Sequence, residues 1–117
     1  MSVDPLLEKH CHPCAAGTPA MDPVAAQQLL KQLDHWEIIN GKCLRKTYPC
    51  KDFMTAVGLI QRLASIAEAN NHHPDLHLTG YKSLTVELST HSIGGLSDND
   101  FILAAKIDRI ITHFPPP

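Results

Sequence analysis

The pattern of apolar and polar residues along the chain indicates where strands form. Between residues 83 and 90 polar and apolar side chains alternate, which places Leu84, Val86 and Leu88 on one face of an extended segment. This is the clearest strand in the sequence. A shorter strand is expected just before it, over residues 75–79.

A second pair of strands is predicted around Asn40-Gly41. These two residues tolerate the positive φ angles of a type I′ turn, and they separate two segments of strand character, residues 36–39 and 42–48. Pro49 is expected to close the second segment. The sequence therefore predicts a hairpin with a two-residue turn.

Apolar residues that recur every three or four positions predict helices. The first helix covers about residues 23–33 and begins after Asp22, which can serve as its N-cap. The second covers about residues 52–71. Because proline disfavours helical geometry in the residue before it, Pro74 requires this helix to end at or just before the His72-His73 pair.

A third helix is expected to begin after Ser97, its N-cap. The resulting order is helix, two strands, helix, two strands, helix. This order predicts an α+β fold: a four-stranded antiparallel sheet with three helices packed on one face. A chain of 117 residues suits one such domain, which we place at residues 21–117. Residues 1–20 follow no regular period and are expected to be a leader that is ordered only in part.

The composition argues against nucleic acids and membranes as partners. Ten Lys and Arg oppose twelve Asp and Glu, for a net charge of -2, and no block of like charges stands out. No apolar run approaches the roughly 18 residues that a membrane-spanning helix needs. Since no secretory signal is recognisable either, we expect a soluble protein of the cytoplasm.

The four cysteines are expected to be reduced, because disulfides belong to secreted chains. Cys11 and Cys14 form a Cys-x-x-Cys pair that could bind zinc or act as a redox pair. A structural zinc site usually needs a second pair of ligands, which the sequence lacks, so no metal site is predicted. Cys43 and Cys50 are expected to be ordinary small apolar residues.

Candidate chemistry concentrates in a short stretch rich in histidine. Glu68 and His72 are four residues apart, so their side chains are expected to meet on one face of the second helix. His73 is expected to turn away as that helix ends. His91 directly follows the strand of residues 83–90, with a parity that places it opposite the buried apolar residues. Imidazoles from two elements are therefore expected to converge on the open side of the sheet.

A spaced motif runs through this region: Glu68, His72-His73-Pro74, Tyr81, His91 and Asp100. It resembles the motif of the pterin-4a-carbinolamine dehydratases, in which an acidic residue, His-His-Pro, an aromatic residue, a histidine and an aspartate follow one another at the same spacings. The segments at residues 71–75 and 90–96 are also similar to that family. The resemblance covers about residues 36–111.

The resemblance implies a hydro-lyase that converts 4a-hydroxytetrahydrobiopterin, the pterin-4a-carbinolamine, to quinonoid dihydropterin and water. This step recycles the pterin cofactor of aromatic amino acid hydroxylases, so a functional link to such an enzyme is expected. No metal or organic cofactor is expected, and family members form dimers or tetramers. The resemblance also implies a set of substrate contacts: His72, His73, Pro74, Thr90, His91, Ser92 and Ile93.

Loss of the 4a-hydroxyl needs an acid for the departing oxygen and a base for the proton on N5. Histidine can serve as either, because its unperturbed pKa of about 6.5 lies near neutral pH. We expect His72, His73 and His91 to share these roles, with Glu68 orienting His72 and Asp100 orienting a neighbouring group. Which histidine is the acid and which the base stays open, since neighbouring imidazoles titrate as a coupled set.

Several of these residues also have structural explanations. Asp100 occupies the third position of the helix capped by Ser97, so it can complete a capping box. Glu68 can equally be a solvated helix residue. Tyr81 is expected to pack or to end a strand, and His77 to face water.

Two other classes of function are open at this stage. Proteins similar to this family serve as non-catalytic interaction modules, either as a dimerisation cofactor of a transcription factor or as assembly factors. The assembly factors tend to lack the catalytic histidines, which this chain keeps, so the enzyme is favoured. A metal-dependent hydrolase is the other class, and the missing His-Glu-x-x-His pattern argues against it.

Overall fold

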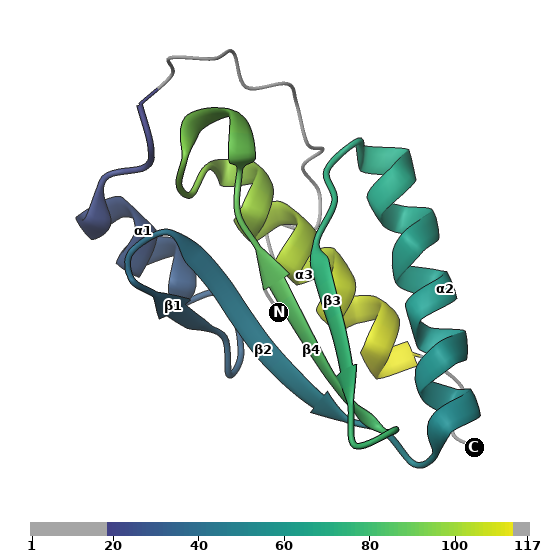
Figure 1. Cartoon of the computed structure of the whole chain (residues 1–117). Helices are drawn as coiled ribbons and strands as arrows, with labels where there is room; N and C mark the ends of the chain where they lie inside the picture. Colours follow the sequence, from purple (N-terminus) through teal and green to yellow (C-terminus); the bar gives the residue numbers. More distant parts are fainter. Residues whose placement is uncertain (1–18, 114–117) are drawn as a thin grey trace.

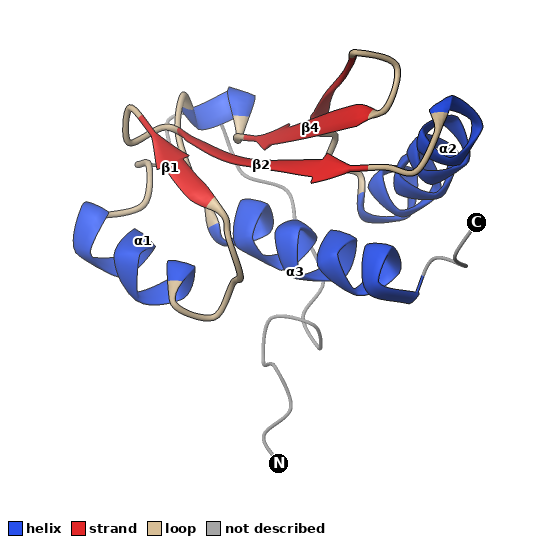
Figure 2. Ribbon diagram, turned by 90° about the horizontal axis from the view of Figure 1, so that it is seen from below, coloured by secondary structure: helices blue, strands red, loops and turns tan. Residues whose placement is uncertain are grey.

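A computed structural model describes residues 19–113 of the chain. The four strands form one antiparallel sheet in the order β1-β2-β4-β3. Figure 1 shows α3 behind the sheet and α2 alongside β3, and Figure 2 shows α1 and α3 on the same side of the strands. This arrangement confirms the predicted α+β fold. The elements are α1 (Pro23–Leu30), β1 (Glu37–Ile39), β2 (Cys43–Pro49), α2 (Phe53–Asn70), β3 (Asp75–Thr79), β4 (Ser83–Leu88), a short 3-10 helix η1 (His91–Ile93) and α3 (Asp98–His113).

Most of the predicted leader, with Cys11 and Cys14, lies outside the described residues. The roles suggested for these two cysteines therefore stay predictions. Within the described part, Met21 is already tied to the domain, because its backbone N–H donates to the carbonyl oxygen of Leu96 at 2.8 Å.

The first hairpin has the predicted turn but one more connecting residue than expected. Asn40 and Gly41 both have positive φ, and the N–H of Lys42 donates to the carbonyl oxygen of Ile39 at 3.0 Å. The strand register, however, pairs Ile39 with Cys43. The predicted two-residue connection is therefore wrong by one residue, because Lys42 lies beyond the turn without joining the ladder.

Two elements end earlier than the sequence predicts. α1 stops at Leu30 rather than near residue 33, because the chain tightens into hydrogen bonds three residues apart, from Gln32 N–H to Leu29 and from Leu33 N–H to Leu30. β4 stops at Leu88 because Thr90 forms an isolated bridge with Gly95 instead of pairing with β2.

None of the helices within residues 19–113 is long and apolar enough to cross a membrane.

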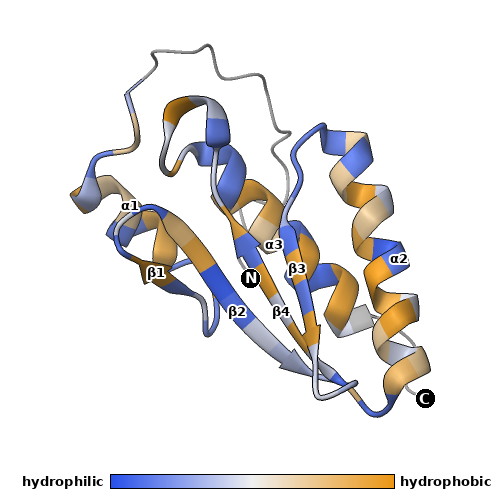
Figure 3. Cartoon of the chain, viewed as in Figure 1, coloured by the Kyte–Doolittle hydropathy of each residue, from blue (hydrophilic) through white to orange (hydrophobic). Residues whose placement is uncertain are grey.

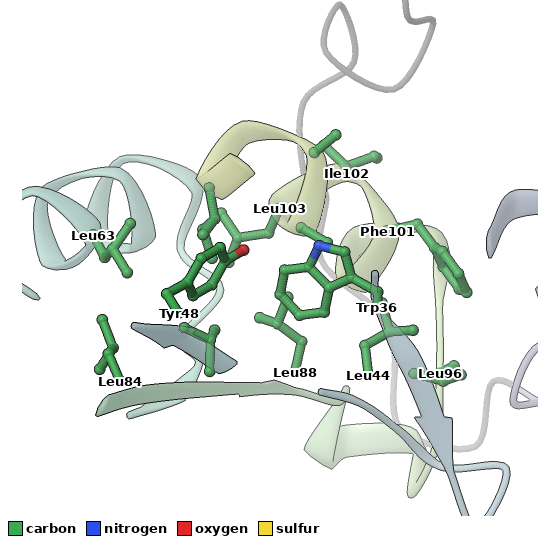
Figure 4. Packing of buried hydrophobic residues seen from close by; sticks show 14 of the residues in the cluster. Trp36, Leu44, Tyr48, Leu63, Leu84, Leu88, Leu96, Phe101, Ile102 and Leu103 are labelled. Atoms are coloured by element: carbon green, nitrogen blue, oxygen red, sulfur yellow. The ribbon is translucent and has the colours of Figure 1, made fainter. Parts of the chain in front are cut away.

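The core lies between the inner face of the sheet and the helices. Hydrophobic and hydrophilic positions alternate along the strands (Figure 3), and in β4 the predicted residues Leu84, Val86 and Leu88 are fully buried. In the close-up, Leu84 and Leu88 face Leu63 of α2 and Leu103 of α3 (Figure 4). Burial of these apolar side chains is the main force that holds the helices to the sheet.

A carboxylate at the edge of this core joins three separate segments. Asp108 of α3 accepts hydrogen bonds from the indole N–H of Trp36 at 2.9 Å, the ammonium of Lys46 at 2.9 Å and the hydroxyl of Tyr48 at 2.6 Å. Burial and the neighbouring Asp108 carboxylate raise the pKa of Tyr48, so the phenol stays protonated and donates. The contacts tie α3 to β2 and to the chain entering β1.

We predict that Asp108→Ala lowers the free energy of unfolding by about 3 kcal/mol. The substitution removes the acceptor of the Trp36 and Tyr48 donors and the counter-charge of the mostly buried Lys46 ammonium, which keeps only the carbonyl oxygen of Asp34 among the described residues. Asp34→Ala is the matched control, because the Asp34 side chain is 90% exposed. We expect the control to cost less than about 0.5 kcal/mol. Urea unfolding of both variants measures the difference, and equal stabilities contradict the role given to Asp108.

Candidate active site

The end of α2 determines where the two adjacent histidines point. Asn71, the residue after the helix, adopts the left-handed conformation with φ 50 and ψ 40. Its N–H bonds to the carbonyl oxygens of Ala67 and Glu68, and the N–H of His72 donates to Ala67 at 3.1 Å. This is the Schellman type of helix end, in which one left-handed residue turns the chain out of the helix. The backbone therefore carries His72 and His73 away from helical positions.

His72 turns toward the core and meets Asp100. Its Nε2 lies 2.6 Å from Oδ1 of Asp100, and the histidine side chain is 11% exposed while Asp100 is fully buried. Asp100 was expected to orient a neighbouring group; the imidazole that it contacts is that of His72, and the orienting role stays a prediction. Because a carboxylate oxygen accepts hydrogen bonds, Nε2 of His72 is the protonated nitrogen in this pair.

Asp100 also caps α3. Its Oδ2 accepts from the backbone N–H of Ser97 at 2.9 Å, and the Ser97 hydroxyl oxygen accepts from the N–H of Asn99 at 3.2 Å. These are the reciprocal bonds of a capping box. The capping explanation of Asp100 is therefore confirmed through Oδ2, while Oδ1 contacts His72.

The sequence predicts that Glu68 meets His72, but this prediction is wrong: Glu68 pairs with His73. Its Oε2 lies 2.5 Å from Nε2 of His73, and both side chains are exposed. The i, i+4 expectation assumed that the helix continued to His72. Since Asn71 is left-handed, the chain turns back and brings the second histidine, rather than the first, over Glu68.

The chain that leaves β4 runs into η1 at the end of the sheet where β3 begins (Figure 1), and His91 is the first residue of η1. His91 is exposed, and among the described residues its imidazole has no hydrogen-bond partner. The residue before it, Thr90, donates its hydroxyl to Oδ2 of Asp100 at 2.8 Å. One carboxylate thus contacts both His72 and the neighbour of His91. The convergence of the imidazoles on the open side of the sheet stays a prediction.

The other predicted contact residues differ in exposure. Ser92 is exposed, and Pro74 and Ile93 are half-buried beside the histidines. Thr90 is buried, and its backbone N–H donates to Gly95 at 2.8 Å, so its polar groups are used within the protein. Tyr81 lies in the turn between β3 and β4, at the far end of these strands and about 17 Å along β3 from the histidines.

The loop after η1 is packed too closely for a larger residue. A Cβ atom on Gly95 would lie 2.8 Å from the Cβ of Ala20, nearer than such atoms approach. Ala20, which was assigned to the leader, therefore contacts the loop that carries Thr90 and His91. The apolar pattern of the sequence held no signal for this contact, because neither residue belongs to a periodic segment.

A row of charged groups lies on the open face of the sheet. Glu87 of β4 accepts from Arg45 Nε at 2.7 Å and contacts His77 Nε2 at 2.9 Å. These two neighbours hold the pKa of Glu87 below its usual range. His77, expected to face water, is exposed but bonded. No three ligand-type side chains converge on a metal position within residues 19–113.

The comparisons with known proteins agree with the motif. The sequence model of the family described as pterin 4 alpha carbinolamine dehydratase matches residues 19–110. The chain belongs to this family. Pterin-4-alpha-carbinolamine dehydratase 2, mitochondrial, of Arabidopsis thaliana is 42% identical over 93% of this chain, which spans 60% of that relative. A Nitrosospira multiformis relative of the same family name is 40% identical, over 93% of this chain and 95% of its own.

Two solved structures show a similar architecture. A protein from Brucella melitensis, described as a transcriptional coactivator/pterin dehydratase, is 30% identical with a TM-score of 0.72, over 78% of this chain and 97% of its own. A pterin dehydratase-like protein, identified as a RuBisCO assembly factor in the alpha-carboxysome, shares the fold at 16% identity and a TM-score of 0.55. The dehydratase family predicted from the sequence is therefore confirmed.

We predict that Asn71→Ala lowers the free energy of unfolding by about 1 kcal/mol, because a side chain without the polar group of asparagine is strained in the left-handed region. Asn71→Gly serves as the control and is expected to match or exceed wild-type stability. Urea unfolding distinguishes the two. An alanine variant as stable as the glycine variant contradicts the account of this helix end.

A second prediction concerns acid pH. Because the folded state lowers the pKa of Glu87, this carboxylate stabilises the fold above its unfolded pKa of about 4.3 and loses that effect as pH falls through the folded value. The stability difference between wild type and Glu87→Gln is therefore expected to shrink between about pH 5 and about pH 3. Urea unfolding at several pH values measures it, and a constant difference is the contrary result.

Proposed function

We propose that the chain catalyses the dehydration of 4a-hydroxytetrahydrobiopterin to quinonoid dihydropterin and water. The hydroxyl leaves C4a with a proton from the protein, and the proton on N5 passes to the protein. The observation that carries the proposal is the histidine set: two adjacent histidines are each bonded through Nε2 to their own carboxylate, and the ring of a third, His91, has no hydrogen-bond partner within residues 19–113. Such an arrangement supports proton transfer in both directions.

The hydrogen bonds indicate which ring nitrogens can take part. Nε2 of His72 and Nε2 of His73 are held by Asp100 and Glu68, so Nδ1 is the nitrogen that each ring has left for proton exchange. His73 is 56% exposed, whereas His72 is mostly buried. We therefore assign the direct substrate contacts first to His73 and His91, with His72 completing the set.

The residues around the histidines fit a flat, polar ring system. Pro74 and Ile93 are half-buried and offer apolar surface for the faces of a pterin, while η1 presents Ser92 beside His91. Thr90, which is buried, holds this segment through its hydrogen bond to Asp100. The acid and base roles are shared by a coupled group of imidazoles, because the deprotonation of one changes the charge that its neighbours experience.

We further infer a place for this activity in recycling the pterin cofactor of an aromatic amino acid hydroxylase, in the cytoplasm. Family membership supports this inference, although the Arabidopsis relative is named mitochondrial. A homodimer or homotetramer is part of the proposal, since β1 and β3 are the edges of the sheet and an edge strand can pair with a second copy.

The proposal predicts that wild-type protein accelerates the decay of 4a-hydroxytetrahydropterin, followed by its ultraviolet absorbance. His73→Ala and His91→Ala are each expected to lower the catalysed rate by about 10²-fold, because each removes an acid or a base. His35→Ala is the matched control. His35 is an exposed histidine before β1, paired with Asp34 at 3.6 Å, and its loss is expected to leave the rate unchanged.

No acceleration by folded wild-type protein contradicts the dehydratase proposal and favours the interaction module. Equal rates in wild type and both site variants contradict the histidine mechanism while leaving the activity in place. Circular dichroism of each variant shows that the fold is retained.

A further inference from the structure

A directed chain of hydrogen bonds lies behind the histidines. The Thr90 hydroxyl has one proton, which it donates to Asp100 Oδ2 at 2.8 Å. In the 2.6 Å contact between the hydroxyls of Thr90 and Ser97, Ser97 is therefore the donor. The N–H of Asn99 donates in turn to the Ser97 oxygen at 3.2 Å. Each proton in this chain points toward the Asp100 carboxylate.

The two carboxylate oxygens of Asp100 accept hydrogen bonds from different parts of the protein. Oδ2 accepts from the Thr90 hydroxyl and from the backbone N–H of Ser97, which both belong to the framework of the loop and of α3. Oδ1 accepts from Nε2 of His72 at 2.6 Å. Two fixed donors on Oδ2 set the plane of the carboxylate, and that plane aims Oδ1 at the histidine. The residues that make these bonds, His72, Thr90, Ser97 and Asp100, are all largely buried. Breaking one of the bonds therefore leaves a polar group that water cannot easily reach.

We propose that Thr90 and Ser97 are positioning residues of the site: their hydroxyls hold the Asp100 carboxylate so that it keeps His72 in the Nε2-protonated tautomer. Thr90 also precedes His91 in the chain, so the same bond fixes where η1 begins. The effect on His72 is independent of substrate, whereas its consequence for catalysis rests on the proposed dehydratase function.

Thr90→Val removes the hydroxyl at nearly constant shape and tests the proposal directly. In wild type, nitrogen-15 NMR of the imidazoles is expected to show His72 as a single Nε2–H tautomer. In Thr90→Val the signal is expected to move toward a mixture of the two tautomers, and Thr90→Ser is expected to restore it. Thr47→Val is the matched control, since the Thr47 hydroxyl bonds to Thr85 at 2.8 Å on the open face of the sheet.

The kinetic expectation for Thr90→Val is a fall in kcat of about tenfold with little change in KM, because the lost hydroxyl donates to a charged group inside the protein. Thr90→Ser is expected to recover most of the rate, and Thr47→Val to keep the wild-type value. A folded Thr90→Val protein with the wild-type tautomer and kcat overturns the proposal. If Thr90→Val does not fold, Ser97→Ala decides: a tautomer mixture supports the proposal and a single tautomer overturns it.

The NMR measurement separates this proposal from the proposed function. A single His72 tautomer that depends on Thr90, in a protein without dehydratase activity, supports the positioning role and contradicts the function. If the protein has dehydratase activity but the His72 tautomer is the same with and without the Thr90 hydroxyl, the proposed function is supported and the positioning role is contradicted.

Discussion

The site depends on one buried carboxylate. Asp100 is fully buried, and the three donors that surround it come from the end of β4, the start of α3 and the chain that leaves α2. A carboxylate in such a place is costly to bury without its hydrogen bonds. The requirement to satisfy it therefore brings the three segments together, and it does so at the end of the sheet where the histidines lie. The same carboxylate therefore holds the start of α3 and the two segments that carry the histidines.

Much of the fold could be predicted because it follows from local patterns. The alternation in β4, the Asn40-Gly41 turn and the caps Asp22 and Ser97 each specify their element from a few neighbouring residues. The predictions were wrong where pairing between strands, rather than the order of neighbouring residues, determines the structure. The hairpin connection is one residue longer than predicted, because the register between β1 and β2 pairs Ile39 with Cys43. β4 is two residues shorter than predicted, because Thr90 bridges to Gly95.

The sequence singled out the residues of the candidate site, but it did not predict their contacts. The motif spacing singled out Glu68, His73 and Asp100, yet the pairing of Glu68 was wrong because it assumed an unbroken helix. A left-handed Asn71 cannot be distinguished by periodicity from one more helical residue. Thr90 was expected to touch substrate, and its inward role was missed, because a threonine at the end of a strand gives no sequence signal of the carboxylate that it meets.

The central claim is that Asp100 organises a dehydratase site as well as a helix end. The most direct measurement is the dehydration rate of Asp100→Asn beside its free energy of unfolding. Asparagine keeps the size of the side chain, but its amide group presents one acceptor oxygen where the carboxylate presents two. The account predicts a folded variant whose kcat is at least about 10²-fold lower, with KM little changed. A folded variant that works within a few-fold of the wild-type rate contradicts it.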